Sequence, residues 1–491
     1  MADGREVELK LELPEGQGDT LHAHPLLAGV AGVQKAQTTI YYDTPKGALT
    51  KSGYTLRLRT VGDRHVQTIK QTAGGSAGLF DRPEWEEDVA GPHIDFAALD
   101  RTPLGVVLGK KARHKLEAVI TSTVNRTIWL VPYQGSEIEL SLDEGTVSAA
   151  GAEQRLAELE LELKQGEPAT ILAFARELGR TTELRIGVLT KAERGVSLAN
   201  GTAGRVAKAE PLSIAPAMDV REAFAAIIHA CLKHFRLNEP LVVARQDPKA
   251  LHQARVAMRR LRSAFSLFGT AVEDEEMARL REELRWFTAQ LGDARNLDVL
   301  IERFEDAPLS PENRASLDAA RARAYDIVLA ALQSQRLRDL ILDLVGWVEF
   351  GQWRGNAEAR APIAHFAVAR LDKRWRKIKK AGRDLQALEE EPRHRVRIEI
   401  KKLRYAIEFL SALFGPKKQK TFLAAMATMQ EELGSLNDFA TAREVLAQIP
   451  GLDPQSIPAP TAAEEQKHLA NAQQAYAEAA AVGPFWRKAA A

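Results

Sequence analysis

The segment Glu6-Val7-Glu8-Leu9-Lys10 determines which fold we expect for the first part of this chain. Side chains alternate between the two faces of a β-strand, so the three charged residues share one face while the two apolar residues occupy the other. Taken alone, the segment is typical of a strand whose charged face is solvated. Two carboxylates beside an ammonium group are also what a site needs to hold a divalent cation together with a phosphate chain.

Charged faces of this kind recur through about the first 200 residues. They are found in Leu56-Arg57-Leu58-Arg59, Thr68-Ile69-Lys70, Glu84-Trp85-Glu86, Asn125-Arg126-Thr127, Glu137-Ile138-Glu139-Leu140 with Asp143, and Glu158-Leu159-Glu160-Leu161-Glu162-Leu163-Lys164. In a flat sheet such rows would only be a wet face, but a closed barrel would cover its apolar face outside and turn the charged face into a tunnel. Buried charge of one sign is too costly, and here both signs occur in comparable numbers. If the strands close in this way, the N-terminal part is a closed antiparallel β-barrel whose interior would bind a polyanion through Arg and Lys.

Length and composition limit the class of protein. A chain of 491 residues predicts two or three domains, and its 45% hydrophobic and 27% charged residues are typical of a globular protein. The formal net charge of +1 hides the local segregation of charge. The single cysteine, Cys231, excludes an internal disulfide and, beside Ile227, Ile228 and Leu232, is expected to be a buried structural thiol. No apolar run approaches the ~18 residues of a membrane span, so we expect a cytoplasmic protein with no membrane partner.

The pattern of the sequence changes near residue 200. Residues 1–200 consist of short segments rich in Val, Thr, Ile and Tyr, punctuated by Gly, Pro and Asp, which predict strands. Residues 201–216 predict a linker, and residues 217–491 have helical periodicity almost throughout, with Ser310-Pro311 as a helix start signal. From Pro450 on, the chain is Ala-rich and weakly specified. The expected fold class is α+β, with a barrel followed by an all-α, duplicated helical bundle.

An internal repeat is the reason to expect a duplicated bundle. Residues 252–262 (HQARVAMRRLR) align without gaps with residues 394–404 (HRVRIEIKKLR), an offset of 394 − 252 = 142. Each copy is followed by a Leu-Gly motif, at Leu291-Gly292-Asp293 and at Leu433-Gly434-Ser435. Such self-similarity indicates a duplicated helical unit. Helical spacing in the first copy predicts a core face made of Ala257, Leu261, Ala264, Phe265 and Phe268.

Basic residues of the repeat form a stripe on another face of each helix. The two stripes consist of His252, Arg255, Arg259 and Arg262 and of His394, Arg397, Lys401 and Arg404, with Arg260 and Lys402 beside them. Cations on one helix face repel each other, so an unliganded stripe is costly. One stripe is typical of a solvated basic face, whereas two related by pseudo-twofold symmetry could face each other across a cleft and bind an extended anion. The histidines have no third ligand at metal spacing and no nucleophile beside them, so we expect neither a metal site nor catalysis there.

The first part of the chain resembles the CYTH superfamily of triphosphate tunnel enzymes, which includes inorganic triphosphatases, thiamine triphosphatases and some adenylyl cyclases. Besides the charged rows, the resemblance rests on Tyr41-Tyr42-Asp43-Thr44-Pro45 and on Lys191-Ala192-Glu193-Arg194-Gly195. The tyrosine segment by itself is typical of a strand that ends in a turn. The ordered motifs cover roughly residues 1 to 200.

This resemblance implies a role for each charged row. Phosphate binding is implied for Lys10, Arg57, Arg59, Lys70, Arg126 and Lys191, in a substrate site that also contains Glu84 and Glu86. Mg²⁺ or Mn²⁺ binding is implied for Glu6, Glu8, Asp143, Glu158 and Glu160, with Glu162 as an alternative because this chain has three carboxylates in register where the family has a pair. The catalytic residues in this interpretation are Glu6, Glu8, Lys10, Arg57 and Arg59. Clamping cations and a metal suit phosphoryl transfer, which needs positioning and charge stabilisation.

The helical part resembles the CHAD domain, a conserved-histidine α-helical domain often fused to CYTH in bacteria. The resemblance extends from about residue 217 to the helices around Leu446 and rests on the duplicated motifs. It implies binding of inorganic polyphosphate. Nucleic acid is the rival polyanion, but the stripes lack interleaved stacking aromatics and the sequence contains no recognised nucleic-acid module.

The two resemblances together predict an enzyme that hydrolyses a triphosphate, with inorganic tripolyphosphate as the first candidate, and that binds polyphosphate through its helical part. Association with polyphosphate granules is a further expectation. A polyphosphate-binding module accompanies an inorganic phosphate chain more naturally than it accompanies thiamine. Two alternatives stay open: an enzyme that acts on nucleoside or thiamine triphosphate or cyclises ATP, and a polyphosphate-binding scaffold without activity. The preferred triphosphate, the number of metal ions and the oligomeric state are left open.

Overall fold

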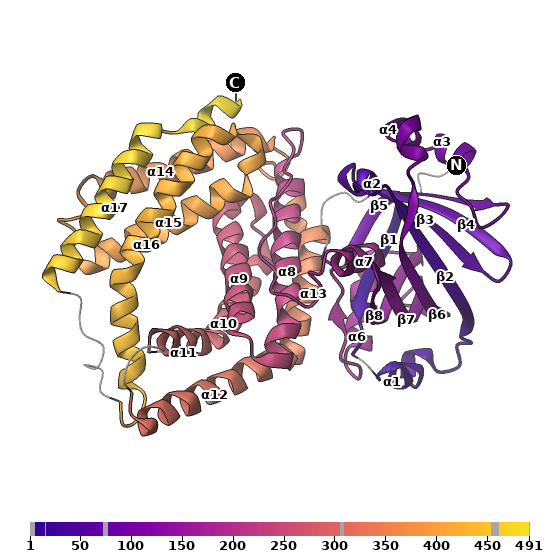
Figure 1. Cartoon of the computed structure of the whole chain (residues 1–491), viewed down its shortest axis with the longest axis horizontal. Helices are drawn as coiled ribbons and strands as arrows, with labels where there is room; N and C mark the ends of the chain where they lie inside the picture. The colour runs from indigo at the N-terminus through magenta and orange to yellow at the C-terminus, as the bar shows by residue number, and fades with distance from the viewer. Residues whose placement is uncertain (1–4, 15, 72–76, 305–308, 453–460, 491) are drawn as a thin grey trace. The chain divides into compact units, whose positions relative to one another are not determined.

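The computed structural model describes residues 5–14, 16–71, 77–304, 309–452 and 461–490, with the backbone alone at residues 5, 6, 80–82, 437–440 and 488–490. The chain divides into two compact units. One unit comprises Met1–Arg205 with Gln335–Gly346, and the other comprises Val206–Ser334 with Trp347–Ala491. The first unit is built on a β-sheet and the second is all-helical, which confirms the expected α+β class (Figure 1).

The sheet of the first unit is antiparallel, as expected. Its strands are β1 (Arg5–Glu12), β2 (Val33–Asp43), β3 (Tyr54–Val61), β4 (Arg64–Gln71), β5 (Leu79–Val89), β6 (Glu117–Tyr133), β7 (Ser136–Ala149), β8 (Ala152–Gln165) and β9 (Arg185–Ile186). They are hydrogen-bonded in the order β5-β4-β3-β2-β6-β7-β8-β1-β9. Every charged row predicted from the sequence therefore lies on a strand with described neighbours.

Strand β1 also pairs with β5, which joins the far strand of this order to β1. Residues 79–83 of β5 pair with β1, whereas residues 84–89 pair with β4. No described residue of β5 thus has strand partners on both sides, so the expected closed barrel is corrected to a sheet with a divided seam at β5. Strand β4 is described as far as Gln71, and its described residues pair only with the second half of β5.

Both faces of the sheet are buried around strand β1. In β1 the apolar Leu9 and Leu11 are buried, and so are the charged Glu8 and Lys10 that alternate with them. Short helices pack on part of the apolar face, where Leu49 and Leu104 lie in one cluster with strand residues such as Leu56. The helices of this unit are α1 (Gly18–His22), α2 (Ala48–Lys51), α3 (Phe96–Asp100), α4 (Pro103–Val107), α5 (Lys110–Arg113), α6 (Ala169–Leu178) and α7 (Lys191–Ala199). Burial of the charged face is what the tunnel interpretation requires.

Helix α7 is held against strands β6, β7 and β8 by local sequence features. Its N-terminus carries a capping box, in which the Thr190 hydroxyl accepts from the Glu193 N–H and the Glu193 carboxylate accepts from the Thr190 N–H. Gly195 permits close packing, because a Cβ at this position would lie 2.4 Å from a methyl group of Ile120. These contacts determine the position of Lys191, the first residue of the helix, relative to the sheet.

The helices of the second unit follow the repeat in the sequence. They are α8 (Val220–Arg245), α9 (Pro248–Phe268), α10 (Glu275–Gln290), α11 (Gly292–Arg303), α12 (Pro311–Gln333), the last residues of α13 (Gln335–Phe350), α14 (Ile363–Ala381), α15 (Glu390–Phe409), α16 (Pro416–Ala447) and α17 (Ala462–Val482). Helices α9 and α15 begin at 248 and 390, an offset of 142, and carry the two basic stripes. The unit boundary falls within α13, between Gly346 and Trp347. No helix in the described ranges is both long enough and apolar enough to cross a membrane.

Several expectations for the helical unit are confirmed. Ala257, Leu261, Ala264, Phe265 and Phe268 are all at most 1% exposed, as the helical spacing predicts. The Cys231 thiol is buried, and burial raises its pKa to about 11. Ser310 caps α12 by accepting from the Asn313 N–H, with Pro311 as the first helical residue. Within the predicted linker, both the N–H and the C=O of Ala207 are hydrogen-bonded to the buried Asn238 side chain on α8.

The end of the chain is more ordered than its composition indicates. Beyond residues 453–460, which lie outside the described residues, a Thr461 capping box begins α17. The fully buried Trp486 follows, and its indole N–H donates to the Asp372 carboxylate at 2.8 Å. Trp486 also packs against Phe422. The expectation of a weakly specified end is therefore wrong for residues 461–487, because a single aromatic anchor outweighs an Ala-rich composition.

Candidate active site

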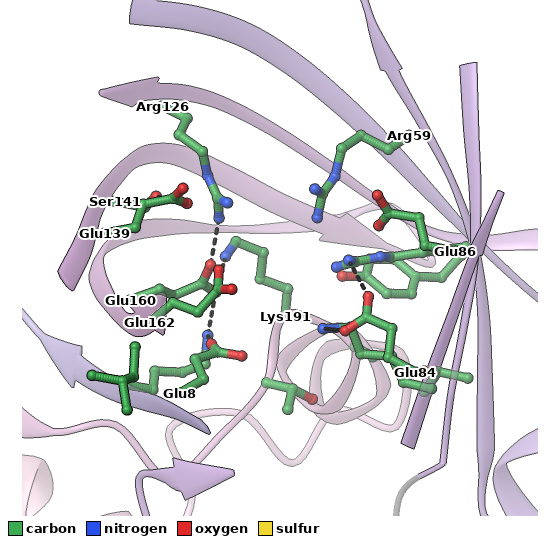
Figure 2. Close-up of a pocket in the computed structure, with 18 of the residues that line it drawn as sticks. Glu8, Arg59, Glu84, Glu86, Arg126, Glu139, Ser141, Glu160, Glu162 and Lys191 are labelled. Atoms are coloured by element: carbon green, nitrogen blue, oxygen red, sulfur yellow. Dashed lines mark hydrogen bonds and ion pairs between the residues drawn. The ribbon is translucent and has the colours of Figure 1, made fainter. Parts of the chain in front are cut away.

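A cavity of about 530 Å³ lies on the charged face of the strand unit (Figure 2). It brings together most of the residues predicted for the tunnel. Of these, Glu8, Lys10, Arg57, Arg59, Lys70, Glu84, Glu86, Arg126, Glu160, Glu162 and Lys191 line the cavity. Asp143 and Glu158 are fully buried and contact lining residues without lining the cavity themselves. Glu6 lies on β1, but its side chain is outside the described residues.

A cluster of three carboxylates forms the acidic centre of the site. Ligand atoms of Asp143, Glu158 and Glu160 all lie within 4.8 Å of one another. Strand register explains the cluster, since Asp143 on β7 is paired with Glu158 on β8, and Glu160 is paired with Lys10 on β1. Directly opposed residues share a face of the sheet, so the two rows converge on the cavity side.

Two lysines neutralise much of this cluster. The Lys191 ammonium lies 2.7 Å from an Asp143 oxygen and 3.1 Å from a Glu160 oxygen, and it also contacts Glu158. The Lys10 ammonium contacts Glu160 and lies 3.3 Å from Glu158. Burial alone would lower the pKa of each lysine, but the neighbouring carboxylates raise both above the ordinary value.

Arg126 completes the ion-pair network with a forked interaction. Its Nε and Nη2 donate to the two Asp143 oxygens at 2.6 and 2.5 Å, and Nη2 also donates to Glu160 at 2.5 Å. Burial would raise the pKa of Asp143, but Lys191 and Arg126 outweigh it and hold this pKa at about 2. The pKa of Glu160 is likewise held well below its usual range, since Lys10 and Lys191 outweigh its burial.

The opposite wall carries a second, smaller group of charges. Glu84 accepts from Arg57 at 3.4 Å and lies 2.5 Å from the Lys70 ammonium. Glu86 accepts from the Thr68 hydroxyl at 3.2 Å. Trp85, between the two glutamates, points away into the apolar cluster, as the alternation predicts.

Arg59 is the exception among the basic side chains of the described lining, because no described carboxylate forms an ion pair with it. Its Nε is buried and has no hydrogen-bond partner in the described structure. Nearby Arg57, burial and Arg126 together lower the pKa of Arg59 to about 10. Figure 2 shows Arg59 and Arg126 both pointing into the cavity. The site therefore contains an unmatched guanidinium aimed at the space where a ligand would bind.

The three glutamates of β8 differ in the residues that they contact. Glu158 and Glu160 belong to the acidic cluster with Asp143, whereas Glu162 lies 2.6 Å from Lys164 and pairs with Glu139 on β7. The arrangement therefore favours Glu158 and Glu160 over Glu162 as the pair implied by the CYTH resemblance.

Some lining residues were not assigned a role from the sequence. These are Tyr41, Thr55, Glu139, Ser141, Leu163, Lys164, Thr190 and Ala192. The period-two alternation contained a signal for two of them, since Thr55 shares a strand face with Arg57 and Ser141 shares one with Asp143. For Tyr41 the sequence predicts only a strand that ends in a turn. The turn exists, because β2 ends at Asp43, whose carboxylate accepts from the N–H groups of Thr44 and Leu49.

The basic stripes of the helical unit are connected to the Leu-Gly motifs of the repeat. A Cβ at Gly292 would lie 3.5 Å from the Arg255 guanidinium, and a Cβ at Gly434 would lie 3.5 Å from that of Arg397. Both pairs are related by the offset of 142. Arg255 also donates to the carbonyl of Leu291 at the end of α10. The sequence repeat is thus a structural repeat of an arginine stacked over a glycine.

Stripe residues differ in how well their charge is matched. Arg260, Lys402 and Arg404 lie 3.1, 3.0 and 3.3 Å from glutamate oxygens, of Glu408, Glu399 and Glu408. Arg262 is exposed, and partial desolvation and the nearby Arg285 lower its pKa. His394 is exposed, while Arg397 and Lys401 are half-buried. The two predicted residues beside the stripes, Arg260 and Lys402, are therefore tied to carboxylates.

The first stripe is crowded with positive charge. Burial and the nearby Arg259 and Arg295 lower the pKa of Arg255 to about 10, and burial and the same neighbours lower the pKa of His252 to about 4. The Arg259 guanidinium lies 5.6 Å from the ring centroid of Tyr405 on α15, so the stripe reaches the second repeat. Arg295 on α11 was missed in the sequence, because it lies far along the chain from the aligned segment.

Comparison with known domain families agrees with these arrangements. The CYTH domain model matches residues 4–196, and the CHAD domain model matches residues 226–447. The chain joins a CYTH domain to a CHAD domain. The CYTH match spans every strand of the sheet, and the CHAD match spans both stripes and both Leu-Gly motifs.

Individual relatives cover different parts of the chain. An inorganic triphosphatase of Haemophilus influenzae is 30% identical over 164 residues, which are 32% of this chain and 44% of that protein. An uncharacterised protein of Mycobacterium tuberculosis is 26% identical over 505 aligned residues, covering 94% of this chain and 90% of its own length. The solved CHAD domain of the plant Ricinus communis is 29% identical with a TM-score of 0.46, covering 58% of this chain and 95% of its own. The match thus spans less than half of the Haemophilus triphosphatase.

Proposed function

We propose that the CYTH domain hydrolyses a triphosphate, with inorganic tripolyphosphate as substrate, and that the CHAD domain binds inorganic polyphosphate. The observation that carries the first part is the buried, unmatched Arg59 guanidinium in a cavity whose other basic side chains are ion-paired. An anion entering the cavity would meet Arg59 at once and compete for its neighbours Arg57 and Arg126. The resemblance to an inorganic triphosphatase supports the same assignment.

The residues of the acidic centre fit a divalent cation. The Oε2 atom of Glu158 is buried and has no hydrogen-bond partner in the described structure, so one carboxylate oxygen of the cluster is unused. An all-carboxylate donor set is what Mg²⁺ or Mn²⁺ prefers. Asp143, Glu158 and Glu160 would hold the ion, with Glu8 beside them.

The balance of charge also requires a cation. Seven basic side chains line the cavity, against six lining carboxylates and two more, Asp143 and Glu158, buried behind them. The protein alone therefore cannot neutralise a triphosphate, which carries several negative charges. A divalent cation would supply the missing positive charge and would polarise the phosphoryl group or the attacking water.

The basic residues of the chain would bind and orient the substrate. Arg59, Arg57 and Lys70 lie on one wall of the cavity. Arg126, Lys10 and Lys191 lie near the acidic centre, so a phosphate chain spanning the cavity would be held at both ends. Fixed donors of this kind stabilise charge on the transferred phosphoryl group without reorganising during the reaction.

The lining favours an inorganic chain over a nucleotide or thiamine compound. Tyr41 is the one aromatic residue among the described lining residues, and the apolar lining is limited to Leu163 and Ala192. A base or a thiazole ring is usually held between apolar or aromatic surfaces, which this lining does not supply. Charged groups continue to the Glu139, Glu162 and Lys164 end of the cavity instead.

Polyphosphate binding by the CHAD domain is supported by the crowded first stripe. The depressed pKa values of Arg255 and His252 reflect burial together with nearby positive charge, which Asp293 and Glu302 offset only in part. A bound chain of phosphates would relieve this repulsion between the basic side chains.

A phosphate-release assay tests the enzymatic part of the proposal. The purified full chain is incubated with tripolyphosphate, ATP or thiamine triphosphate, each with Mg²⁺, with Mn²⁺ or with EDTA. We expect the highest kcat/KM with tripolyphosphate, loss of activity in EDTA, and recovery when a divalent ion is restored. Glu8→Gln should abolish most of the activity while the thermal unfolding midpoint stays near that of the wild type. Full turnover in EDTA would refute the metal-dependent mechanism, and preference for either organic triphosphate would refute the substrate assignment.

A further inference from the structure

Helix α7 directs two basic residues, Lys191 and Arg194, toward Glu158. Lys191 and Arg194 are three residues apart, so they lie on the same side of the helix. The Lys191 ammonium contacts Oε1 of Glu158. The Arg194 guanidinium faces the other oxygen, Oε2, with its Nε at 3.9 Å. Each oxygen of this buried carboxylate therefore has its own cation on α7.

The Arg194 contact differs from the Lys191 contact in length. A separation of 3.9 Å is too long for a hydrogen bond but short enough for charge attraction. Neither Arg194 Nε nor Glu158 Oε2 has a hydrogen-bond partner in the described structure, although both atoms are buried. The guanidinium thus faces Oε2 without occupying it.

Glu12 explains why Arg194 stops short of Glu158. An Nη2 atom of Arg194 lies 2.5 Å from a Glu12 oxygen, and the Arg194 side chain is only 12% exposed. Glu12 on β1 is the direct cross-strand partner of Glu158 on β8. Two carboxylates opposed in this way repel each other, and the guanidinium stands between them.

We propose that Arg194, anchored by Glu12, is a positioning residue that orients Glu158 so that its Oε2 atom stays available to a divalent cation. This inference rests on the proposed metal-dependent function of the same site. Lys191 and Lys10 both contact Oε1 of Glu158, so these two lysines alone would leave the carboxylate free to turn about that oxygen. Arg194 restrains the second oxygen by charge, and its bond to Glu12 prevents it from closing onto Oε2 and blocking the ligand position.

Mn²⁺ binding by the full chain, without substrate, tests this role directly. Free Mn²⁺ is followed by electron paramagnetic resonance for the wild type, Arg194→Ala and Arg194→Lys. Loss of an outer-sphere partner typically costs 10–100-fold in metal affinity, so we expect roughly that loss in Arg194→Ala and partial recovery in Arg194→Lys. Arg180→Ala is the matched control, because Arg180 is exposed, pairs with Glu177 and lies outside the cavity lining. It should bind Mn²⁺ as the wild type does.

A second variant guards against misfolding of the first. Glu12→Gln leaves Arg194 in place but removes its anchor, and it should also weaken Mn²⁺ binding. The double variant Glu12→Gln/Arg194→Ala should be no weaker than Arg194→Ala alone, because both changes act through one contact. Wild-type Mn²⁺ affinity in Arg194→Ala and Glu12→Gln, with triphosphatase activity present in the wild type, would overturn the positioning role alone. A wild-type chain that neither binds Mn²⁺ nor hydrolyses a triphosphate would overturn the proposed function and this inference with it.

Discussion

The cavity of the CYTH domain and the first basic stripe of the CHAD domain both concentrate positive charge, but they neutralise it differently. In the cavity, each lysine or arginine of the described lining except Arg59 has a carboxylate partner. In the stripe, neither Arg255 nor Arg259 forms an ion pair with a described carboxylate, and the positive charges of Arg259 and Arg295 lower the pKa of Arg255. When an anion binds in a cavity whose charges are already matched, a cation must bind with it to keep the charge balanced. An unmatched basic stripe can be neutralised by an anion alone. This difference in charge matching is what the two proposed functions, hydrolysis in the cavity and binding at the stripe, would use.

The largest effect should come from Arg59, the residue at which the cavity resembles the stripe. Arg59→Met removes the unmatched charge and keeps most of the side-chain volume. Loss of one donor preorganised for transition-state charge typically costs about 10²–10³ in kcat, and we expect this loss in the phosphate-release assay.

The same substitution should not lower the thermal unfolding midpoint. The pKa of Arg59 is depressed to about 10, so at neutral pH the folded state holds this charge at a cost, which the methionine removes. Arg64→Met, at an exposed residue of β4 paired with Asp88, is the control and should keep full activity. Wild-type turnover in Arg59→Met would contradict a role of Arg59 in catalysis and would leave the charges of the cavity as structural ion pairs only.

The second prediction concerns the stripe. Arg255→Gln with Arg259→Gln should weaken binding of long-chain polyphosphate by roughly tenfold or more and should flatten the dependence of log K on log salt, by about one unit per arginine that contacts phosphate. Both side chains are half-buried and Arg255 bonds the Leu291 carbonyl, so the neutral glutamine is preferable to a charge reversal.

Two controls make the stripe measurement specific. Arg395→Gln removes an exposed arginine from α15 that lies outside the stripe and pairs with Glu391. Arg59→Met alters the cavity alone. An equal loss of affinity in Arg395→Gln would indicate general charge attraction without a defined stripe.

The third prediction uses the matched charges of the cavity. The pKa of Asp143 is about 2 in the folded protein, below its ordinary 3.8, so its ion pairs stabilise the fold above about pH 4. This contribution should be lost as the pH falls from about 4 to 2, since the unfolded chain takes up the proton first. Urea unfolding of the wild type and Asp143→Asn between pH 5 and 2.5 measures it. The difference in free energy of unfolding should shrink toward low pH, and a difference that is constant with pH would contradict the assignment.

The smallest effect is a change in one titration within the stripe. Burial and Arg295, Arg259 and Arg255 hold the pKa of His252 at about 4, so this imidazole is neutral at pH 7. Bound polyphosphate would neutralise the arginines and raise the pKa of His252 toward its ordinary value. Nuclear magnetic resonance of the His252 ring, with and without polyphosphate at equal ionic strength, checks the shift. An unchanged titration would place the anion away from the first stripe.

Local patterns in the sequence predicted a large part of this structure. The alternation along Glu6 to Lys10 and along Glu158 to Lys164 identified strands and their charged faces, because a strand has a fixed period of two. The gapless alignment of residues 252–262 with 394–404 identified the repeat, because equivalent helices keep equivalent faces. The same local reasoning missed Thr55 and Ser141, which are neutral members of charged rows.

Other features depended on contacts between distant segments. Trp486 anchors the end of the chain on Asp372, 114 residues away, which the composition of residues 461–487 did not indicate. Arg295 joins the stripe because α11 returns toward α9. The divided seam at β5 depends on where β4 ends and on the pairing of β1, which no single segment specifies.

By itself the sequence determined the strand and helix faces and the kinds of charge on each face, because these depend on neighbours within a few residues. It also determined the duplication, because two copies of one segment can be aligned without knowledge of their contacts. Tertiary structure alone decided which charges meet. Lys191 reaches Glu158 across 33 residues and Lys10 reaches Glu160 across 150, whereas Arg59 forms no ion pair with a described carboxylate and its Nε has no hydrogen-bond partner in the described structure. These pairings depend on strand register and on the docking of α7, and a shift of one residue in register would send each side chain to the opposite face.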